Sequence, residues 1–397
     1  MQDTCIIGGG PAGMMLGLLL ARAGLPVTVL EKHIDFFRDF LGDTVHPSTL
    51  QLFHELGLFD RFLQLPHSQV TGLSAVVGGR KFVMSDFSDL STRAKFIALM
   101  PQWDLLDFLA KEAAHYPTFT LRMGWEATGL IEHNGATTGV RANTPSGPVE
   151  IPAVLTVGCD GRHALSRVAA HLPLKEEGVP IDVLWFRMGR RPSDPENALG
   201  YVNFGRLVVL INRGDYFQVG YLIAKGHFTR IQQDGLTAFR QSLERIVPFL
   251  AGRTAEIDAW NKIKLLTIQV NRLERWSSPG LLCIGDAAHA MSPVGGIGIN
   301  IALQDAVATA NLLTEALRDD ALSPHDLQRV QHHREHAVRN TQRVQLFAHR
   351  ILNRVLHETG PLTPPLALRV LTQLPGFQQL AARFIGIGLQ PEHIQPL

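Results

Sequence analysis

Three glycines near the amino terminus, Gly8, Gly10 and Gly13, have the spacing of a loop that binds a dinucleotide. The first allows a sharp turn after a strand, the second lets the backbone approach a pyrophosphate, and the third lets a helix pack closely on the sheet. The loop includes Pro11 and Ala12, and the free N–H groups at the helix start would face the phosphates. Because such glycines also occur for packing alone, the flanking elements decide between the two interpretations.

The elements around these glycines favour the dinucleotide. An apolar run at residues 4–7 precedes the loop, residues 14–23 predict a helix, and residues 27–30 predict a second strand that ends at Glu31. A carboxylate at that place can accept hydrogen bonds from the hydroxyls of an adenosine ribose, and it would repel a 2′-phosphate. The sequence therefore predicts a dinucleotide site that does not hold NADP.

A second glycine-rich segment, residues 285–300, follows a predicted strand at residues 280–284 and leads into a helix at residues 300–317. Asp286 can bond a polyol hydroxyl or a pyrophosphate. The remaining residues leave a smooth wall with exposed N–H groups, which suits a planar ring that becomes negative when reduced. The candidate residues of this wall are Pro293, Gly296, Gly298, Ile299 and Asn300.

Further polar residues lie at the ends of predicted elements. Asp160 ends a strand in an Asp-Gly turn, where its carboxylate can accept from backbone or from a ligand, and Gln102 stands at a helix start. The loop after Glu31 leaves the nucleotide end of the sheet, so Lys32 and Arg38 can face a cofactor. His46 is either a helix-start histidine bonded to backbone or a residue beside the cofactor.

The middle of the chain has the sequence pattern of an antiparallel sheet. Residues 180–225 predict antiparallel strands, followed by a helix at residues 235–245 and a strand at residues 264–270. Such a sheet offers one face to helices and the other to something flat and apolar, although most of its aromatic residues would be ordinary core. The candidate substrate residues are Trp185, Phe204, Phe217 and Tyr221.

Composition agrees with an enzyme of two closely joined domains, since 45% of the 397 residues are hydrophobic. A net charge of +1 gives no reason to expect nucleic acid as a partner. The three cysteines lack CxxC spacing and indicate buried thiols in a cytoplasmic protein. His332 and His336 have a spacing compatible with a metal, but without a third ligand they indicate a solvated helix face, and no metal site is predicted.

The three motifs, taken in order, resemble those of FAD-dependent monooxygenases related to para-hydroxybenzoate hydroxylase, the group A aromatic hydroxylases, over about residues 1–317. The resemblance implies an α/β fold: a Rossmann-like FAD-binding domain of the GR2 type, an inserted antiparallel-sheet substrate domain and C-terminal helices. The expected parts are three FAD-binding segments (1–70, 101–175 and 273–320), substrate-domain strands (71–100), the antiparallel-sheet substrate domain (176–272) and a C-terminal helical region (321–397).

The resemblance also implies roles for the candidate residues. The first glycine loop and Glu31 would hold the ADP half of FAD, and Gln102 and Asp286 the ribityl and pyrophosphate region. Pro293 and the backbone of residues 296–300 would lie beside the isoalloxazine. Leu41 stands where many members carry a basic residue, so Arg38 is the candidate for that pyrophosphate contact.

The implied activity is hydroxylation of an aromatic or polycyclic small molecule through a flavin C4a-hydroperoxide, with NADH or NADPH as a transient reductant and O2 as the oxidant. Such chemistry often needs no acid or base from the protein, and only His46 and His289 are offered as catalytic candidates near the flavin edge. The C-terminal helices would form a lid rather than touch a membrane.

Three alternatives compete with this function. One is a non-oxygenating FAD-dependent dehydrogenase or reductase that acts on a quinone or isoprenoid-like substrate. A flavin halogenase should carry a Trp-x-Trp-x-Ile-Pro segment, which the chain lacks. A non-enzymatic FAD-binding module would show no oxidation of NAD(P)H with any substrate.

Overall fold

A six-stranded sheet forms the centre of the computed structural model, which describes residues 3–37, 44–195, 199–358 and 360–396. Its strand order is β20-β21-β12-β1-β2-β8, and all neighbouring strands are parallel except β20 and β21. β1 is buried along its whole length, as its apolar sequence predicts. The strands are β1 (Thr4–Ile7), β2 (Val27–Glu31), β8 (Phe119–Met123), β12 (Leu155–Gly158), β20 (Ser277–Ser278) and β21 (Leu281–Cys283).

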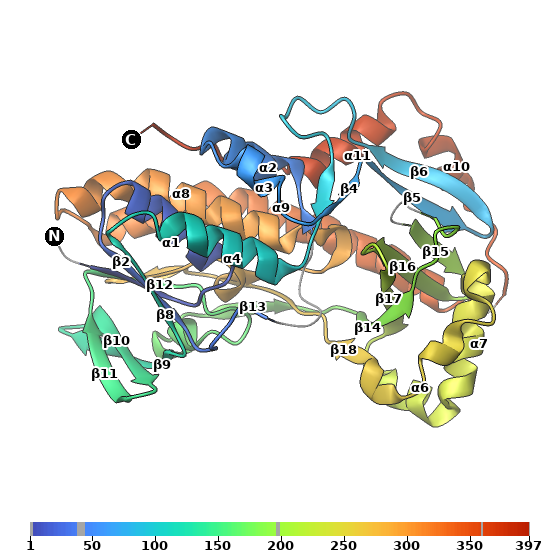
Figure 1. Cartoon of the computed structure of the whole chain (residues 1–397), viewed down its shortest axis with the longest axis horizontal. Helices are drawn as coiled ribbons and strands as arrows, with labels where there is room; N and C mark the ends of the chain where they lie inside the picture. Colours follow the sequence, from blue (N-terminus) through green and yellow to red (C-terminus); the bar gives the residue numbers. More distant parts are fainter. Residues whose placement is uncertain (1–2, 38–43, 196–198, 359, 397) are drawn as a thin grey trace.

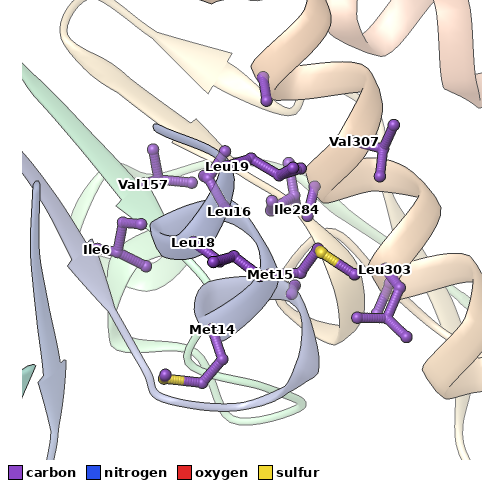
Figure 2. Close-up of a cluster of buried hydrophobic side chains, with 14 of the residues drawn as sticks. Ile6, Met14, Met15, Leu16, Leu18, Leu19, Val157, Ile284, Leu303 and Val307 are labelled. Carbon is purple, nitrogen blue, oxygen red and sulfur yellow. The ribbon is translucent and has the colours of Figure 1, made fainter. Parts of the chain in front are cut away.

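Helix α1 (Pro11–Arg22) packs between this sheet and helix α8 (Gly298–Arg318), and Figure 2 shows their side chains meeting, with Ile6, Met15 and Leu303 among them. The approach of α1 to the sheet is so close that a Cβ at Gly13 would overlap the carbonyl oxygen of Gly8. The glycine loop is therefore required by packing as well as suited to a ligand. The structure thereby confirms the predicted α/β fold.

A seven-stranded sheet forms the second layer, on the right in Figure 1. Its order is β18-β14-β17-β16-β15-β5-β6, and only the β15–β5 pair among its described strands is parallel. Helices α6 (Phe228–Asp234) and α7 (Leu236–Ile246) lie beside it, and α7 packs on one face. The strands are β5 (Gly72–Val77), β6 (Arg80–Asp86), β14 (Ile181–Gly189), β15 (Leu199–Asn203), β16 (Arg206–Asn212), β17 (Tyr216–Ala224) and β18 (Lys264–Leu266).

Three small sheets, each of three strands, complete the β-structure. They are β11-β10-β9, β13-β19-β22 and β3-β7-β4. Their strands are β3 (Thr44–Val45), β4 (Ser68–Val70), β7 (Ile97–Leu99), β9 (Glu126–His133), β10 (Ala136–Thr144), β11 (Gly147–Pro152), β13 (Leu174–Glu177), β19 (Val270–Leu273) and β22 (His289–Ala290).

The longest helix, α9 (Pro324–Leu356), begins with a capping box in which Ser323 and Asp326 bond each other's backbone N–H groups. Helix α11 (Phe377–Gly386) packs on β6, far along the chain from it. The other α-helices are α2 (Pro47–Glu55), α3 (Phe59–Phe62), α4 (Gln102–Ala113), α5 (Leu165–Ala169) and α10 (Leu366–Leu371). The 3-10 helices are η1 (Pro248–Leu250), η2 (Thr254–Glu256), η3 (Trp260–Lys262), η4 (Gly285–Ala287) and η5 (Val294–Gly296).

Two details differ from the sequence prediction. The short runs at residues 118–122, 127–133, 138–142 and 149–155 predict strands of an antiparallel layer, but the first of them falls in the parallel edge strand β8 (Phe119–Met123). The single strand expected at residues 264–270 is two strands, β18 and β19, which belong to different sheets. Within the described part of the chain, no helix is long and apolar enough to cross a membrane.

Candidate active site

A cavity of about 680 Å³ lies where the two main sheets meet. One wall is formed by loops that follow β1, β12 and β21, and the other by side chains of β14, β16 and β18. The loops leave the carboxyl ends of parallel strands, where α/β folds place their ligands. The predicted site residues that line the cavity are Gly10, Pro11, Ala12, Gln102, Trp185, Asp286, Pro293, Gly296, Gly298 and Ile299.

The first glycine loop contains an open position. Gly8 has a φ of +105°, which favours glycine, and it lies against the carbonyl of Cys159. In contrast, apart from its two neighbours in the chain, no described residue has an atom within 4 Å of the place that a Cβ on Gly10 would take. No described side chain caps the start of α1, so its N–H groups are free to meet a ligand. This open space fits the pyrophosphate of a dinucleotide.

Glu31 lies beside this loop and stabilises it. Its Oε2 accepts from the N–H of Gly9 at 3.0 Å, and its Oε1 accepts from the N–H of His33 at 3.0 Å. Each carboxylate oxygen has two acceptor positions, so these bonds are compatible with an added ribose. The ribose contact itself stays a prediction. Lys32 next to it is exposed, and Arg38 lies outside the described residues.

An ion pair that was not predicted from the sequence joins two loops of the cavity wall. Arg162 Nε donates to Asp286 Oδ2 at 3.1 Å, and both side chains line the cavity. The buried Arg167 binds these two loops together, because its guanidinium donates to the carbonyls of Arg162 and Ala287. The position of Arg162, directly after the Asp-Gly turn, is the signal that could have identified it.

Asp160, predicted to bind the cofactor, is occupied within its own turn. Its carboxylate accepts from the N–H of Ser166 at 2.9 Å and from Ser166 Oγ at 2.7 Å. Burial raises its pKa. The residue is not among the described cavity-lining residues, whereas its neighbours Cys159 and Gly161 are. Its side chain therefore shapes the loop that meets the cavity.

His289 belongs to a buried polar cluster behind the wall. Its Nε2 lies 2.6 Å from Asp305 Oδ2, which also accepts from the N–H of Gly285 at 3.1 Å. Arg334 Nε donates to Asp305 Oδ1 at 3.0 Å. Burial alone would raise the pKa of Asp305, but His289 and Arg334 hold it below its ordinary value. The structure places His289 in support of the Gly285 turn, outside the described lining of the cavity.

His46 is also buried away from the cavity. Its Nδ1 donates to the carbonyl of Ile385 in α11 at 2.7 Å, and its own N–H donates to Asn300 Oδ1 at 2.8 Å. Burial lowers its pKa to about 4, so the ring is neutral at neutral pH. Of the two interpretations left open by the sequence, the geometry matches the histidine bonded to backbone.

The side chain of Asn300 uses both its oxygen and its nitrogen to hold the loop wall, on the side away from the cavity. Oδ1 accepts from His46 and from Thr49 Oγ1, and Nδ2 donates to the carbonyls of Thr44 and Gly296 at 3.1 Å each. The side chain thus joins the start of α8 to β3 and α2.

Helix α9 supports the next part of the wall, a contribution that the sequence did not indicate. Gln345 Nε2 donates to the carbonyls of Ser292 and Val294 at 3.0 Å each, and its Oε1 accepts from the N–H of Ser292. His349 Nε2 lies 2.7 Å from Ser292 Oγ, and burial lowers its pKa to about 4. On a helix rich in polar residues, nothing in the sequence separates these two from a solvated face.

Only one of the four predicted substrate aromatics among the described residues lines the cavity. Trp185 does, whereas Phe217 and Tyr221 are buried on the opposite face of the sheet, packed against α7. Phe204 lies at the turn between β15 and β16, 3.7 Å below the Arg245 guanidinium. Strand register explains why Phe217 and Tyr221 do not face the cavity, since neighbouring positions on a strand point to opposite faces.

Within the described ranges, no group of three or more His, Cys, Asp or Glu side chains is placed to hold a metal ion. His336 Nε2 instead contacts Asn340 Nδ2 at 2.8 Å on the exposed side of α9. The described lining of the cavity likewise includes no residue of α10 or α11, the helices expected to form a lid.

A parallel sheet with an open glycine loop, joined across a cavity to a mostly antiparallel sheet, is the arrangement of a dinucleotide-binding protein. The profile of the family described as FAD binding domain matches residues 1–344, and the chain belongs to that family. The protein is therefore an FAD-dependent oxidoreductase of the monooxygenase family.

Individual relatives agree with this assignment. The chain is 28% identical over 396 residues to 6-methylpretetramide 4-monooxygenase of Streptomyces rimosus, covering 96% of this chain and 91% of the relative. It is 26% identical over 348 residues to rifampicin monooxygenase of Streptomyces venezuelae, covering 85% and 69%.

Solved structures show the same fold. PqsL, described as a probable FAD-dependent monooxygenase from Pseudomonas aeruginosa, superposes with a TM-score of 0.76 at 22% identity, covering 90% of this chain and 97% of that chain. The p-nitrophenol 4-monooxygenase PnpA from Pseudomonas putida gives a TM-score of 0.78 at 16% identity, covering 98% and 100%.

Proposed function

We propose that the protein hydroxylates an aromatic or polycyclic small molecule, with FAD lying along the loop wall of the cavity and the substrate against the sheet wall. The observation that carries the proposal is the convergence of the three separate motif loops on one cavity that an antiparallel sheet closes. Support for the substrate class comes from the relatives named for 6-methylpretetramide and rifampicin.

In this arrangement each part of the loop wall meets one part of FAD. The open loop at Gly10 receives the pyrophosphate, with Glu31 at the ribose, and Gln102 and Asp286 take the ribityl and pyrophosphate region. Residues 293–299 lie at the ring. Bound FAD, once reduced by NAD(P)H, supplies the reaction of O2 with the substrate.

The start of α8 gives the ring a favourable electrostatic environment. No described side chain caps this helix, and Gly298 in its first turn lines the cavity. The unpaired N–H groups and the helix dipole stabilise negative charge at that point. The apolar sheet wall excludes water from the same space.

Reductant and location follow from the same proposal. NADH or NADPH binds transiently at the surface and O2 enters as the second substrate. Cys5, Cys159 and Cys283 are all free, and burial raises the pKa of the thiols of Cys5 and Cys283 to about 12. Unreactive, unpaired thiols of this kind support a location in the reducing cytoplasm.

The variant Gly10→Ala tests where FAD binds. Its Cβ enters the open space without touching a described atom, so the apoprotein should lose less than about 1 kcal/mol in free energy of unfolding. The FAD dissociation constant, measured by flavin fluorescence, should rise at least about tenfold. Gly129→Ala in β9 is the matched control, because its Cβ also meets no described atom. Wild-type affinity in Gly10→Ala would refute the placement.

Labelled O2 tests the reaction. The wild-type protein is given NADH or NADPH, a panel of phenols and polycyclic aromatics, and ¹⁸O2, and products are examined by mass spectrometry. A product that gains one labelled oxygen atom supports hydroxylation. Nucleotide oxidation that depends on a substrate but inserts no oxygen would favour the dehydrogenase alternative instead.

A further inference from the structure

We propose that Trp185 and Gly220 act as a pair that forms the floor of the substrate space and selects a flat, uncharged ring system. The inference rests on the proposed function and adds the residues and the substrate chemistry that determine specificity. Three observations carry it: the register of the two strands, the contact between the two residues, and the charge of the cavity lining.

The register places both residues on the same face. Trp185 in β14 lies directly opposite Gly220 in β17, and directly opposite residues of antiparallel strands share a face. Their neighbours Leu184 and Tyr221, which are also opposite each other, point to the other face and pack in the core beneath α7. Trp185 is therefore presented to the cavity while Tyr221 is not.

The contact explains why the partner is glycine. A Cβ on Gly220 would lie 3.1 Å from Cζ3 and 3.1 Å from Cη2 of the indole. These are atoms of the six-membered ring, so that ring lies across the place where a side chain would stand. Any larger residue at position 220 must push the indole into the cavity. Because residue 220 is glycine, the indole can lie flat against the strand, which leaves space on its other side for a second flat ring.

The rest of the floor is apolar or neutral. By register, Ile211 and Leu266 lie on the same face of the sheet as the indole, and Thr267 and Gln269 supply uncharged polar groups to the cavity.

The charged Arg and Asp side chains in the described lining of the cavity already form an ion pair. Of the described Arg, Lys, Asp and Glu side chains, only Arg162 and Asp286 line the cavity, and they pair with each other in the opposite wall. A carboxylate placed over the indole would therefore meet no unpaired arginine or lysine of the described lining, and burying such a charge unpaired is unfavourable. The geometry selects ring systems without a carboxylate, held by stacking on the indole.

The test measures binding of three probes to the FAD-loaded protein by equilibrium dialysis: a hydroxyanthracene, an anthracene carboxylate and phenol. The hydroxyanthracene should bind at least roughly tenfold more tightly than either of the others. Trp185→Ala should weaken its binding by roughly tenfold, while the FAD dissociation constant stays unchanged.

A matched pair of variants isolates the glycine. Gly220→Ala should weaken hydroxyanthracene binding by roughly fivefold, whereas Gly200→Ala in β15 should leave it unchanged, because a Cβ there meets only Ala75 at an ordinary 3.8 Å. If Gly220→Ala fails to fold, the double variant Gly220→Ala with Trp185→Phe gives the methyl group room, so it should bind hydroxyanthracene as tightly as Trp185→Phe alone. Weaker binding by the double variant would show that the methyl group does not act by displacing the indole.

The outcomes separate this inference from the proposed function. If the anthracene carboxylate bound as tightly as the hydroxyanthracene, the proposed role of the Trp185–Gly220 floor would be refuted. Unchanged hydroxyanthracene binding in both Trp185→Ala and Gly220→Ala would refute it as well. Normal FAD binding and labelled oxygen insertion in the same protein would leave the proposed function intact. Loss of FAD binding or of oxygen insertion in the wild-type protein would overturn the proposed function by a readout that does not depend on the probes.

Discussion

The two walls of the cavity are built in different ways. The loop wall presents backbone, from turns that follow parallel strands, and a shell of buried polar side chains around Asp305, Asn300 and Gln345 fixes those turns from behind. The sheet wall presents side chains such as Trp185 and Ile211 from strands whose other face packs on α7. Substitutions behind the loop wall should therefore lower both the free energy of unfolding and the affinity for FAD. Substitutions on the sheet wall that face the cavity should change only the affinity for substrates.

The largest effect is expected from Arg334→Met, which removes the centre of the buried cluster. Arg334 is 1% exposed and bonds Asp305 Oδ1 at 3.0 Å and Glu392 Oε1 at 2.8 Å. Without it, both buried carboxylates lose their arginine partner and keep only histidine side chains, His289 for Asp305 and His333 for Glu392. The free energy of unfolding should therefore fall by about 3–5 kcal/mol. Urea denaturation of the apoprotein measures the loss.

The matched control is Arg339→Met on the same helix, an exposed arginine that lies 3.5 Å from Glu335. A surface pair of this kind contributes at most about 1 kcal/mol. Equal losses in the two variants would contradict the view that the cluster supports the loop wall.

The pH dependence of stability should report His46, whose pKa burial lowers from 6.5 to about 4. The unfolded chain takes up the proton first as the pH falls below 6.5, so this contribution is fully present above that pH and is lost progressively down to about 4. The pKa difference corresponds to a loss on the order of 3 kcal/mol. Denaturation curves between pH 8 and pH 4 measure it.

The variant His46→Asn sharpens this prediction. Its amide can still donate to the carbonyl of Ile385 but does not titrate. The slope of stability against pH should become shallower without vanishing, because the pKa of His349 is also lowered to about 4. An unchanged slope would show that His46 is not buried as a neutral ring.

A smaller loss is expected from Asn300→Ala, which removes the hydrogen bonds to the buried N–H of His46 and to the carbonyls of Thr44 and Gly296. Stability should fall by about 2 kcal/mol, and FAD should bind more weakly because the Gly296 turn is released. Asn311→Ala on the same helix is the control, since its amide bonds the exposed C-terminal segment at the carbonyl of His393. FAD affinity should be unchanged there, and a parallel drop in both variants would contradict the clamp.

The difference between the walls also explains what the sequence could predict. Glycine, proline and aspartate at the loop wall are required by turns and close approaches, so their types and spacing carry the information. The supporting residues Gln345 and His349 lie far along the chain on a polar helix, where spacing does not reveal a buried partner. The direction of a short strand could not be predicted either: nothing in the sequence of β8 (Phe119–Met123) shows that it pairs in parallel at the sheet edge.

The sheet wall was only partly predictable because a register decides it. Trp185 and Tyr221 have similar chemistry and lie in neighbouring strands, yet only the pairing of Trp185 with Gly220 shows which of them faces the cavity. A shift of one residue in that pairing would exchange the two faces.

The smallest effect, and the strictest test of the two faces, is expected from Tyr221→Phe. Tyr221 Oη lies 2.8 Å from Ser242 Oγ in α7, so its removal should cost about 0.5–1.5 kcal/mol of stability. Hydroxyanthracene binding should not change, because the ring packs on the face away from the cavity, whereas Trp185→Phe should weaken it. If Tyr221→Phe changed probe affinity as much as Trp185→Phe does, the register would not separate core from floor, and substrate choice would depend on the whole sheet rather than on one of its faces.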